Sequence, residues 1–234
     1  MKKIAIITAR GGSKRIPSKN IKTFCGKPII SHVIKIAINS KIFDEVMVST
    51  DSEKIAEISR TNGASVPFMR SKNNSDDYST TPDVLYEVLN EYKKNGIKFD
   101  IACCIYPTAV LIEKSILKRS LDLLKKNSFD TVFPYARYEH PIQRALLIQG
   151  DKIKMKYPKN YRKRTQDLNN YFYDTGQFYW FKVENFLIKK KLWTNNTGGI
   201  ELLNTDFQDI DNEDDWELAE LKYKYKYNNG ENEF

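Results

Sequence analysis

The 234-residue sequence is poor in cysteine and histidine. Its three cysteines, Cys25, Cys103 and Cys104, form no C-x-x-C pair, so we expect reduced core thiols rather than disulfides or a zinc site. Its two histidines, His32 and His140, do not stand in a triad-like pattern, and we expect neither to be catalytic. These absences exclude a disulfide scaffold and leave carboxylates, lysines and arginines as the groups that carry the chemistry.

Long apolar runs are also missing. The first apolar stretch, Ile4 to Ile7, is short and is soon followed by Arg10 and Gly11, so we expect neither a signal peptide nor a membrane span. We therefore expect a cytoplasmic protein with no membrane partner. With 41% hydrophobic and 29% charged residues, the chain can bury one sizeable core, which favours one domain with an appended lobe.

The formal net charge is +8, from 38 lysine and arginine residues against 30 aspartate and glutamate residues. Such an excess is typical of nucleic-acid binding when the cations are clustered, because they neutralise phosphates. Here much of the excess lies in runs typical of a solvated surface: Lys125-Lys126, 189–191 and 222–226. No base-reading basic helix and no aromatic RNA motif stands out, so we expect no nucleic-acid partner.

Hydrophobic periodicity predicts strands that alternate with helices of about a dozen residues. The expected strands are 3–8, 46–50, 65–68, 101–106, 131–135, 177–181 and one near 200–204. The expected helices are 28–39, 52–62, 82–95, 113–126, one near 183–189 and a last one from Glu213. The alternation implies right-handed crossovers and a doubly wound, mainly parallel (mixed) sheet, whose ligands bind at the carboxyl ends of the strands.

The alternation fails from residue 139 to about residue 173. Residues 144–153 are typical of a hairpin around Gly150-Asp151, and a basic, tyrosine-rich tract follows. We predict an inserted hairpin lobe at 139–173 within an α/β domain formed by 1–138 and 174–234.

The segment A-R-G-G-S-K-R-I-P-S-K-N at 9–20 follows the first strand and combines two adjacent glycines, two serine hydroxyls and four cations. Glycine lets backbone N–H groups approach an anion closely, and the cations add charge. The segment matches neither the Walker pattern nor G-x-G-x-x-G, so classical ATPase and dinucleotide sites are disfavoured. Because a bare Gly-Gly turn is more often plain surface, the hypothesis of an anion site depends on the segment's place after the first strand.

Asp209-Ile210-Asp211 is the second candidate. Two carboxylates at i and i+2 of an extended segment point the same way, and hard oxygen ligands suit Mg²⁺ shared with phosphates. Acidic residues also favour helix N-termini; we assign that role to residues 213–215, and we expect Asp51 to cap the helix after it.

Two further groups of residues could bind substrate. Arg70 and the hydroxyl-rich tract 75–81 precede a helix, where hydroxyls cap the helix or contact a nucleotide. Arginines and glutamines in the lobe could recognise an acidic substrate, although each is individually typical of plain surface: Gln143, Arg144, Arg162, Arg164 and Gln166.

The chain resembles the CMP-sugar synthetases, cytidylyltransferases that activate nine-carbon keto acids of the sialic acid type. The resemblance rests on A-R-G-G-S-K-R-I-P-S-K-N, V-S-T-D-S-x-x-I-A-E, Y-P-T and D-I-D-N-E-D-D-W, in family order over almost the whole chain. Within the family, F-C-G-K-P-I-I, H-P-I-Q-R-A-L and D-T-G-Q-F-Y-W are most similar to the pseudaminic acid branch. The resemblance implies a Rossmann-like nucleotidyltransferase fold in which the lobe is a dimerisation element.

The resemblance also implies a reaction: CTP and a nine-carbon keto sugar acid give a CMP-sugar and pyrophosphate, with Mg²⁺ as cofactor, in a homodimer. The implied nucleotide-binding residues are Arg10, Gly11, Gly12, Ser13, Asn20, Arg70, Ser79 and Thr80. The implied catalytic residues are Arg10, Lys14, Lys19, Asp209 and Asp211, the two aspartates also holding the metal. The implied sugar-acid residues are Tyr106, Gln143, Arg144, Gln166, Asp174, Gln177 and Tyr179, some of them facing the neighbouring subunit's site.

One segment departs from the family pattern. Where many members have Q-P-T-S-P-x-R, residues 106–112 have no glutamine or arginine, and Tyr106 fits the pseudaminic branch. Neuraminic, legionaminic and shorter keto-deoxy acids stay open as substrates, and a non-catalytic nucleotide- or RNA-binding domain stays open as a function of another class. The base that deprotonates the attacking hydroxyl is either a carboxylate of the Asp209/Asp211 pair or a metal-bound water.

Overall fold

This computed structural model describes residues 1–228. The strands are β1 (Lys3–Thr8), β2 (Thr23–Phe24), β3 (Lys27–Pro28), β4 (Glu45–Ser49), β5 (Ile101–Ile105), β6 (Thr131–Arg137), β7 (Leu146–Gln149), β8 (Lys152–Met155), β9 (Phe172–Asp174), β10 (Phe178–Lys182) and β11 (Thr197–Glu201). The helices are α1 (Ile29–Asn39), α2 (Glu53–Thr61), α3 (Thr81–Lys94), α4 (Lys114–Lys126), α5 (Val183–Lys189) and α6 (Glu213–Asn228).

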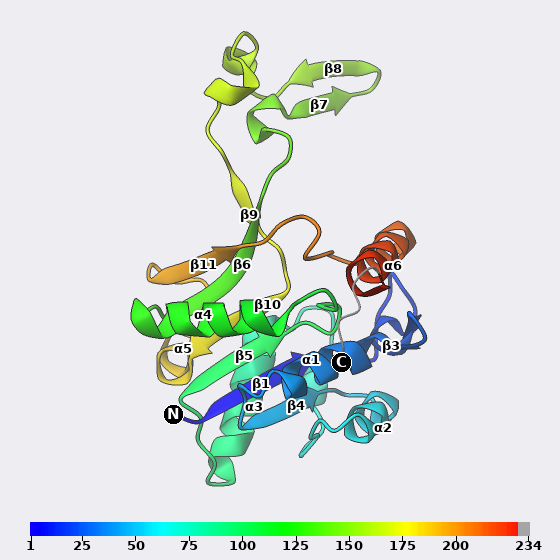
Figure 1. Ribbon diagram of the computed structural model, residues 1–234, viewed down its shortest axis with the longest axis vertical. Coiled ribbons are helices and arrows are strands. Elements are labelled where there is room, and N and C mark those ends of the chain that lie inside the picture. Colours follow the sequence, from blue (N-terminus) through cyan, green and yellow to red (C-terminus); the bar gives the residue numbers. More distant parts are fainter. Residues whose placement is uncertain (229–234) are drawn as a thin grey trace.

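Within the described residues, seven strands form one sheet in the order β11-β6-β10-β5-β1-β4, with β9 paired to β6 (Figure 1). Strand β1 is parallel to β4 and β5, and β11 is parallel to β6. Strand β10 is antiparallel to both β5 and β6, and β9 is antiparallel to β6. The mixed, doubly wound α/β sheet expected from the sequence is therefore confirmed.

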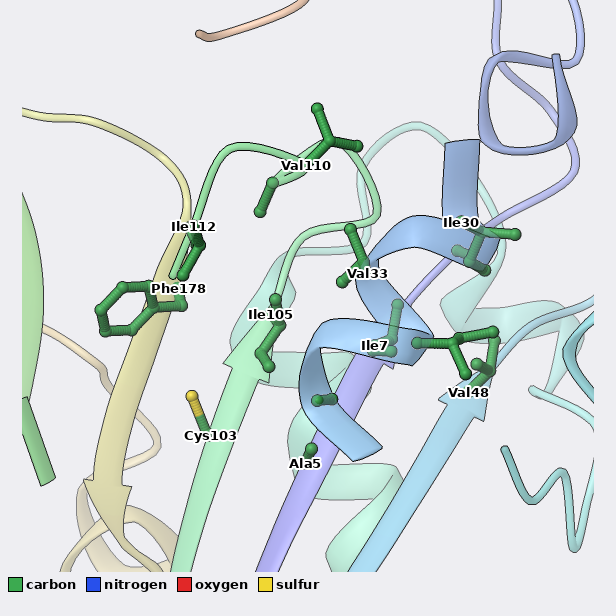
Figure 2. Packing of buried hydrophobic residues seen from close by; sticks show 14 of the residues in the cluster. Ala5, Ile7, Ile30, Val33, Val48, Cys103, Ile105, Val110, Ile112 and Phe178 are labelled. Carbon is green, nitrogen blue, oxygen red and sulfur yellow. The ribbon is translucent and has the colours of Figure 1, made fainter. Parts of the chain in front are cut away.

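Strand β1 is buried on both faces, as its uninterrupted apolar run predicted. Ala5 and Ile7 pack in the cluster under α1, whereas Ile4 and Ile6 pack in the cluster on the opposite face. Figure 2 shows the first cluster, in which side chains of β1, β4, β5 and β10 meet α1. Alternate residues of one strand thus connect the two halves of the core.

Helices cover both faces of the sheet. The first core cluster contains buried residues of α1, α2, α4 and α6, and the second contains buried residues of α3 and α5. The expected helices are confirmed to within two residues at their ends for α1, α2, α3 and α4. No helix within residues 1–228 is long and apolar enough to cross a membrane.

Two expected strands differ from the structure. Residues 65–68 do not form a strand: Ser65 makes a single parallel bridge to Met47, and the chain bonds to this edge again only at Arg70, whose N–H donates to Thr50 O just after β4. The strand expected near 200–204 is β11, which lies at 197–201 because its two glycines, Gly198 and Gly199, pair with β6. An added Cβ at Gly199 would lie 2.6 Å from the ring of Tyr135, so the absence of a side chain permits this pairing.

The segment between β6 and β9 leaves the sheet and carries the hairpin β7–β8 at its far end (Figure 1). The chain that leaves β6 stays paired with the chain that returns to β9, since Tyr138 N donates to Tyr171 O at 3.0 Å. The hairpin turns at Gly150, whose φ of 58° is in the left-handed region that favours glycine. The predicted hairpin is confirmed, and the lobe bounds of 139–173 stay a prediction.

Trp180 of β10 gives a test of this core. The side chain is completely buried and stacks on Phe43, with ring centroids 5.1 Å apart. We expect Trp180→Ala to lower the free energy of unfolding by about 3–5 kcal/mol, because it removes a large apolar side chain and leaves a cavity. Urea denaturation of the variant measures this, with Ile188→Ala on the exposed surface of α5 as the control, for which we expect a change within about 0.5 kcal/mol. A Trp180→Ala loss as small as that of the control would contradict the assignment.

Candidate functional site

A cavity of about 470 Å³ lies at the carboxyl edge of β1 and β5. Residues from several parts of the chain line it: Thr8 at the end of β1, the loop after β1 (10–20), the tract between α2 and α3 (70–79), Thr81 and Val84 of α3, the start of the loop after β5 (106–108), and Asp209 and Asp211 before α6. These segments are far apart in the sequence and meet because parallel strands end at the same edge. Both motifs singled out in the sequence therefore contribute to one site.

The loop after β1 is held by side chains on both of its sides. Asn20, which is buried, donates from Nδ2 to the carbonyl oxygen of Arg10 at 2.8 Å. Gly11 N donates to Asp51 Oδ1 at 2.8 Å, and a Cβ on Gly11 would lie 3.1 Å from Ser52 Cβ. Close packing on the start of α2 therefore favours glycine at position 11. Asp51 was expected to cap α2; instead it anchors this loop, and the N-cap residue Ser52 makes no side-chain cap bond.

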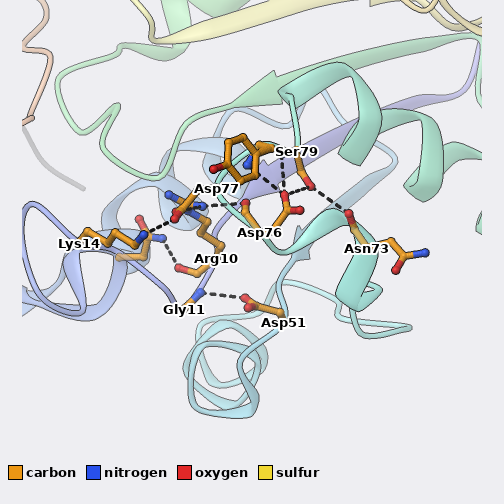
Figure 3. A network of polar contacts seen from close by, with 10 residues as sticks. Arg10, Gly11, Lys14, Asp51, Asn73, Asp76, Asp77 and Ser79 are labelled. Atoms are coloured by element: carbon orange, nitrogen blue, oxygen red, sulfur yellow. Dashed lines mark hydrogen bonds and ion pairs between the residues drawn. The ribbon is translucent and has the colours of Figure 1, made fainter.

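Two cations of this loop are paired with an acidic residue of the 70–79 tract (Figure 3). Arg10 Nη1 lies 2.8 Å from Asp77 Oδ1 and also donates to the carbonyl oxygen of Asp76 at 2.8 Å. Lys14, which is exposed, pairs with the other oxygen of Asp77. Ser13 lines the cavity, whereas Gly11 and Gly12 do not; Gly12 is exposed, with nothing within 4 Å of the position of an added Cβ.

Asp209 and Asp211 line the cavity as a carboxylate pair. The pKa of Asp209 is raised above its usual value, chiefly by burial and then by the charge of Asp211. Asp211 Oδ2 lies 2.6 Å from Arg15 Nη1, a cation to which the sequence analysis gave no role. Two close carboxylates, one of them hard to ionise without a compensating charge, form a donor set that fits a hard divalent cation.

Lys19 lies beside this pair. Its Nζ donates to the carbonyl oxygen of Ile210, between the two aspartates, at 2.6 Å. Burial lowers the pKa of the Lys19 ammonium, and the charge of Asp211 partly opposes this. Asp215 caps α6, as expected, by accepting bonds from the N–H groups of Asp211 and Asn212 at 2.9 and 3.1 Å.

Among residues 1–228, no group of three or more histidine, cysteine, aspartate or glutamate side chains could hold a metal ion. The pair at 209 and 211 would therefore need oxygens of a bound phosphate or water to complete a coordination shell. This is the usual arrangement for Mg²⁺ at phosphate-transfer sites.

Of Arg70 and the hydroxyl residues that follow it, some line the cavity and others cap α3. Arg70 is buried and lines the cavity, with Nε and Nη2 donating to Ser49 Oγ and Ser49 O at 3.0 and 2.6 Å. Ser79 lines the cavity too. Thr80 forms the capping box of α3 with Asp83 and does not line the cavity, whereas the next residue, Thr81, does.

Tyr106 is the one expected sugar-acid residue that lines the cavity of this chain. Burial raises the pKa of its hydroxyl to about 12, and this hydroxyl lies 3.0 Å from Thr81 Oγ1. Behind it, the ring of Tyr179 makes an edge contact with Tyr106, and Tyr179 donates to Asp174 Oδ2 at 2.6 Å. Gln177 is buried next to them with its Oε1 unbonded. Tyr106 thus separates the cavity from a layer of residues behind it, and none of that layer lines the cavity: Asp174, Gln177 and Tyr179.

The expected lobe residues are not at this cavity. Gln143 and Arg144 donate to backbone carbonyls within the lobe, those of Asn169 and Lys163, at 2.8 and 2.6 Å. Gln166 is exposed in a short turn of 3₁₀ helix. Within one chain, the structure therefore separates Gln143, Arg144 and Gln166 from the loop that carries the cations.

Sequence reasoning missed several cavity residues, notably Arg15, Asn74, Asp76 and Asp77. The acidic pair 76–77 stood in the tract already singled out for its hydroxyls. Its charge, opposite to that of the loop at 9–20, was the available signal. The pairing itself joins positions more than sixty residues apart, so no local pattern predicts it.

Comparisons with known proteins agree with this geometry. Residues 4–197 match the family model described as cytidylyltransferase. The chain is 39% identical over 228 residues to the pseudaminic acid cytidylyltransferase of Campylobacter jejuni subsp. jejuni serotype O:2, covering 97% of this chain and 98% of that one. It is 33% identical to N-acylneuraminate cytidylyltransferase A of Danio rerio, covering 93% of this chain and 50% of that one.

Solved structures share the fold. CMP:2-keto-3-deoxy-manno-octonic acid synthetase complexed with CTP superposes with a TM-score of 0.71 at 17% identity, covering 97% of this chain and 100% of that one. The 4-diphosphocytidyl-2C-methyl-D-erythritol synthase of Anaerococcus prevotii DSM 20548 gives a TM-score of 0.64 at 12% identity, covering 95% and 96%. With the matched family model and the relatives above, these findings confirm the resemblance seen in the sequence: the chain belongs to the cytidylyltransferase family.

Proposed function

We propose that this protein is a cytoplasmic enzyme that transfers CMP from CTP to pseudaminic acid, giving CMP-pseudaminic acid and pyrophosphate. The observation that carries the proposal is the meeting of the loop at 9–20 with Asp209 and Asp211 around one cavity, in a chain 39% identical over 97% of its length to a pseudaminic acid cytidylyltransferase. The cations of the loop suit a triphosphate, and the carboxylates suit the reacting end of it.

The nucleotide would occupy the cavity between the loop and Arg70. Arg10, Lys14 and Lys19 would neutralise the triphosphate, and Ser13 would donate a hydrogen bond to it. Arg70 would face the cytidine with Nη1, which has no hydrogen-bond partner within residues 1–228. Ser79 and Thr81, rather than Thr80, are the hydroxyl residues in position to contact the nucleoside.

Asp209 and Asp211 would hold Mg²⁺, which when bound neutralises charge on the phosphates. The raised pKa of Asp209 and its closeness to Asp211 support this assignment, because a cation relieves the repulsion between the two carboxylates. Lys19 would keep the Asp209–Asp211 segment in place through its bond to the carbonyl of Ile210.

The reaction is an in-line displacement at the α-phosphorus. A bond forms between the anomeric oxygen of the sugar acid and the α-phosphorus, and the bond from that phosphorus to the departing pyrophosphate breaks. The barrier falls mainly through positioning and through the charge that Arg10, Lys14 and Lys19 supply to the phosphates. A carboxylate oxygen of the Asp209/Asp211 pair would accept the proton of the attacking hydroxyl.

The sugar acid would bind beside Tyr106, at the open side of the cavity, in a homodimer that completes the site. The hairpin exposes a group of apolar side chains: Leu146, Leu147, Ile148 and Ile153, the last two 76% and 65% exposed and directly paired across the strands. A protruding apolar hairpin is typical of a surface covered by another chain. In such a dimer, Gln143, Arg144 and Gln166 would face the sugar acid in the partner's site.

The substrate proposal has a direct test. With Mg²⁺ and CTP, we expect pyrophosphate release only when a nine-carbon keto acid is added, and fastest with pseudaminic acid. A coupled pyrophosphate assay with pseudaminic, legionaminic and N-acetylneuraminic acids side by side measures this. Faster turnover of another acid would correct the substrate, and CTP binding without turnover of any acid would support a non-catalytic nucleotide-binding domain instead.

The carboxylate pair has a second test. We expect Asp209→Asn and Asp211→Asn each to lower kcat about 100-fold or more, because each variant loses a ligand charge at the reacting phosphate. CTP affinity, measured by calorimetry, should persist in part, since the loop at 9–20 is unchanged. The matched control is Asp214→Asn, which removes the same charge from an exposed neighbour at the start of α6. Equal loss in the control, or no loss at 209 and 211, would overturn the assignment.

The dimer has a third test. We expect the double variant Ile148→Asp, Ile153→Asp to be monomeric in sedimentation velocity, because two charges on the hairpin oppose burial of its apolar face. Its kcat/KM for the sugar acid should fall about tenfold or more, in the range of losing a central interface contact. Ile188→Asp, an equally exposed change on α5, should leave the mass and the activity unchanged. A wild-type protein that is monomeric would remove the basis of this proposal.

A further inference from the structure

We propose that Asp77 is an internal counter-ion that competes with the triphosphate for Arg10 and Lys14, and so weakens the affinity of the enzyme for CTP. The inference rests on the proposed function, because it assumes that the loop at 9–20 binds the phosphates of CTP. It assigns to Asp77 a role opposite to that of the other cavity residues: the carboxylate occupies, in the free protein, the place that a phosphate oxygen would take.

The geometry of the carboxylate supports this role. Each of its two oxygens pairs with a different cation of the loop, Oδ1 with Arg10 Nη1 at 2.8 Å and Oδ2 with Lys14 Nζ (Figure 3). The hydrogen bond from Lys14 and then the pairing with Arg10 lower the pKa of Asp77, so the group is ionised at neutral pH. All three residues line the cavity. A bidentate anion therefore already holds two of the cations that the triphosphate needs.

Arg10 does not depend on this carboxylate for its position. The same Nη1 donates to the carbonyl oxygen of Asp76 at 2.8 Å, and the backbone of Arg10 is held by Asn20. If Asp77 turned away, Arg10 would keep a neutral acceptor and its place in the cavity. The particular contribution of Asp77 is therefore its negative charge rather than the orientation of the arginine.

The residues around Asp77 are held by hydrogen bonds that do not involve its side chain. Asp76 is fixed because its Oδ1 accepts from Tyr78 N, Ser79 N and Ser79 Oγ at 3.0, 2.7 and 2.6 Å. The start of the tract is held by Glu87, which accepts from Ser71 N and Oγ, each at 2.7 Å, and from Asn74. The side chain of Asp77 is 39% exposed. A side-chain rotation toward solvent would release both cations without unfolding the tract.

Electrostatics makes the competition costly for the ligand. A triphosphate carries several negative charges, and a carboxylate left between it and the two cations would repel it while cancelling their attraction. Binding therefore requires the two ion pairs of Asp77 to break, and the free energy of breaking them is subtracted from the affinity for CTP. An enzyme that must also release its pyrophosphate product gains from this, since the returning carboxylate displaces it.

The test measures CTP binding directly, by calorimetry with Mg²⁺ and without sugar acid. We expect Asp77→Asn, which keeps the shape but removes the charge, to bind CTP about three- to tenfold more tightly at low salt, with the difference shrinking as salt is added. The control is Asp44→Asn, which removes a carboxylate that also pairs with a lysine, Lys3, at the start of β1 and away from the cavity. Its affinity for CTP should equal that of the wild type.

The outcomes separate the two proposals. Tighter binding by Asp77→Asn and by Asp77→Ala, with unchanged thermal unfolding, supports the counter-ion role. Unchanged or weaker binding by Asp77→Asn, in a protein whose wild type binds CTP, overturns that role and leaves the cytidylyltransferase proposal intact. Weaker binding would mean that Asp77 positions the cations, and unchanged binding would mean that it does neither. A wild type that does not bind CTP at all overturns the proposed function, and the counter-ion role with it.

Discussion

Burial of β1 on both faces is the constraint that places the site. Its neighbours β4 and β5 are parallel to it in register, so all three strands end at one edge of the sheet. The core clusters on the two faces share no residue of β1, because alternate side chains enter opposite clusters. A shift of the strand by one residue would exchange its side chains between the two clusters, where isoleucine and alanine sizes would no longer match, and would carry Lys3 or Thr8 into a buried position. A fixed end of β1 gives the loop at 9–20 a fixed origin.

Cations of the loop after β1 contact the segment that carries the two aspartates, although the two segments lie almost two hundred residues apart in the sequence. Arg15 pairs with Asp211, Lys19 bonds to the carbonyl of Ile210, and Lys22 pairs with Glu213 at 2.5 Å. All three contacts connect the first loop with the start of α6. Exposed pairs such as Lys22–Glu213 contribute little stability individually, typically about 0–1 kcal/mol. Their effect is on geometry, since together they keep the pair of aspartates opposite the cations of the loop.

What the sequence could predict depends on the range of the interaction. Apolar periodicity predicted β1, β5 and the long helices, because each pattern is local in the sequence and its apolar side chains are the ones that the core buries. The loop at 9–20 and the pair at 209 and 211 were found because their composition is unusual for their position. The partner of Asp77, and the burial of Gln177 behind Tyr106, could not be predicted, since both depend on which distant segments the sheet brings together. The strand expected at 65–68 is reduced to a single bridge between Ser65 and Met47 of β4, because Pro67, two residues further on, has no N–H to continue the ladder.

The lysines of α6 also make long-range contacts that the sequence pattern could not predict. Residues 222–226 were expected to be a solvated basic run, yet Lys222 and Lys226 point back into the molecule while Lys224 is exposed. Lys222 Nζ donates to the carbonyls of Asn204 and Phe207 at 2.7 and 3.0 Å and to Gln208 Oε1 at 2.9 Å. Lys226 pairs with acidic residues in the loops before α6 and α4, at 2.9 and 2.8 Å.

These bonds hold the segment that leads into Asp209, and Gln208 passes the restraint on by donating from Nε2 to the carbonyl of Asp209 at 3.0 Å. Lys222 and Lys226, which contribute to the net positive charge, are therefore bonded within the protein, where they hold the loop that carries the carboxylates. Because a carboxylate pair can act on a phosphate only from a fixed distance, a lysine-rich helix end serves the site through geometry rather than through the net charge of the chain.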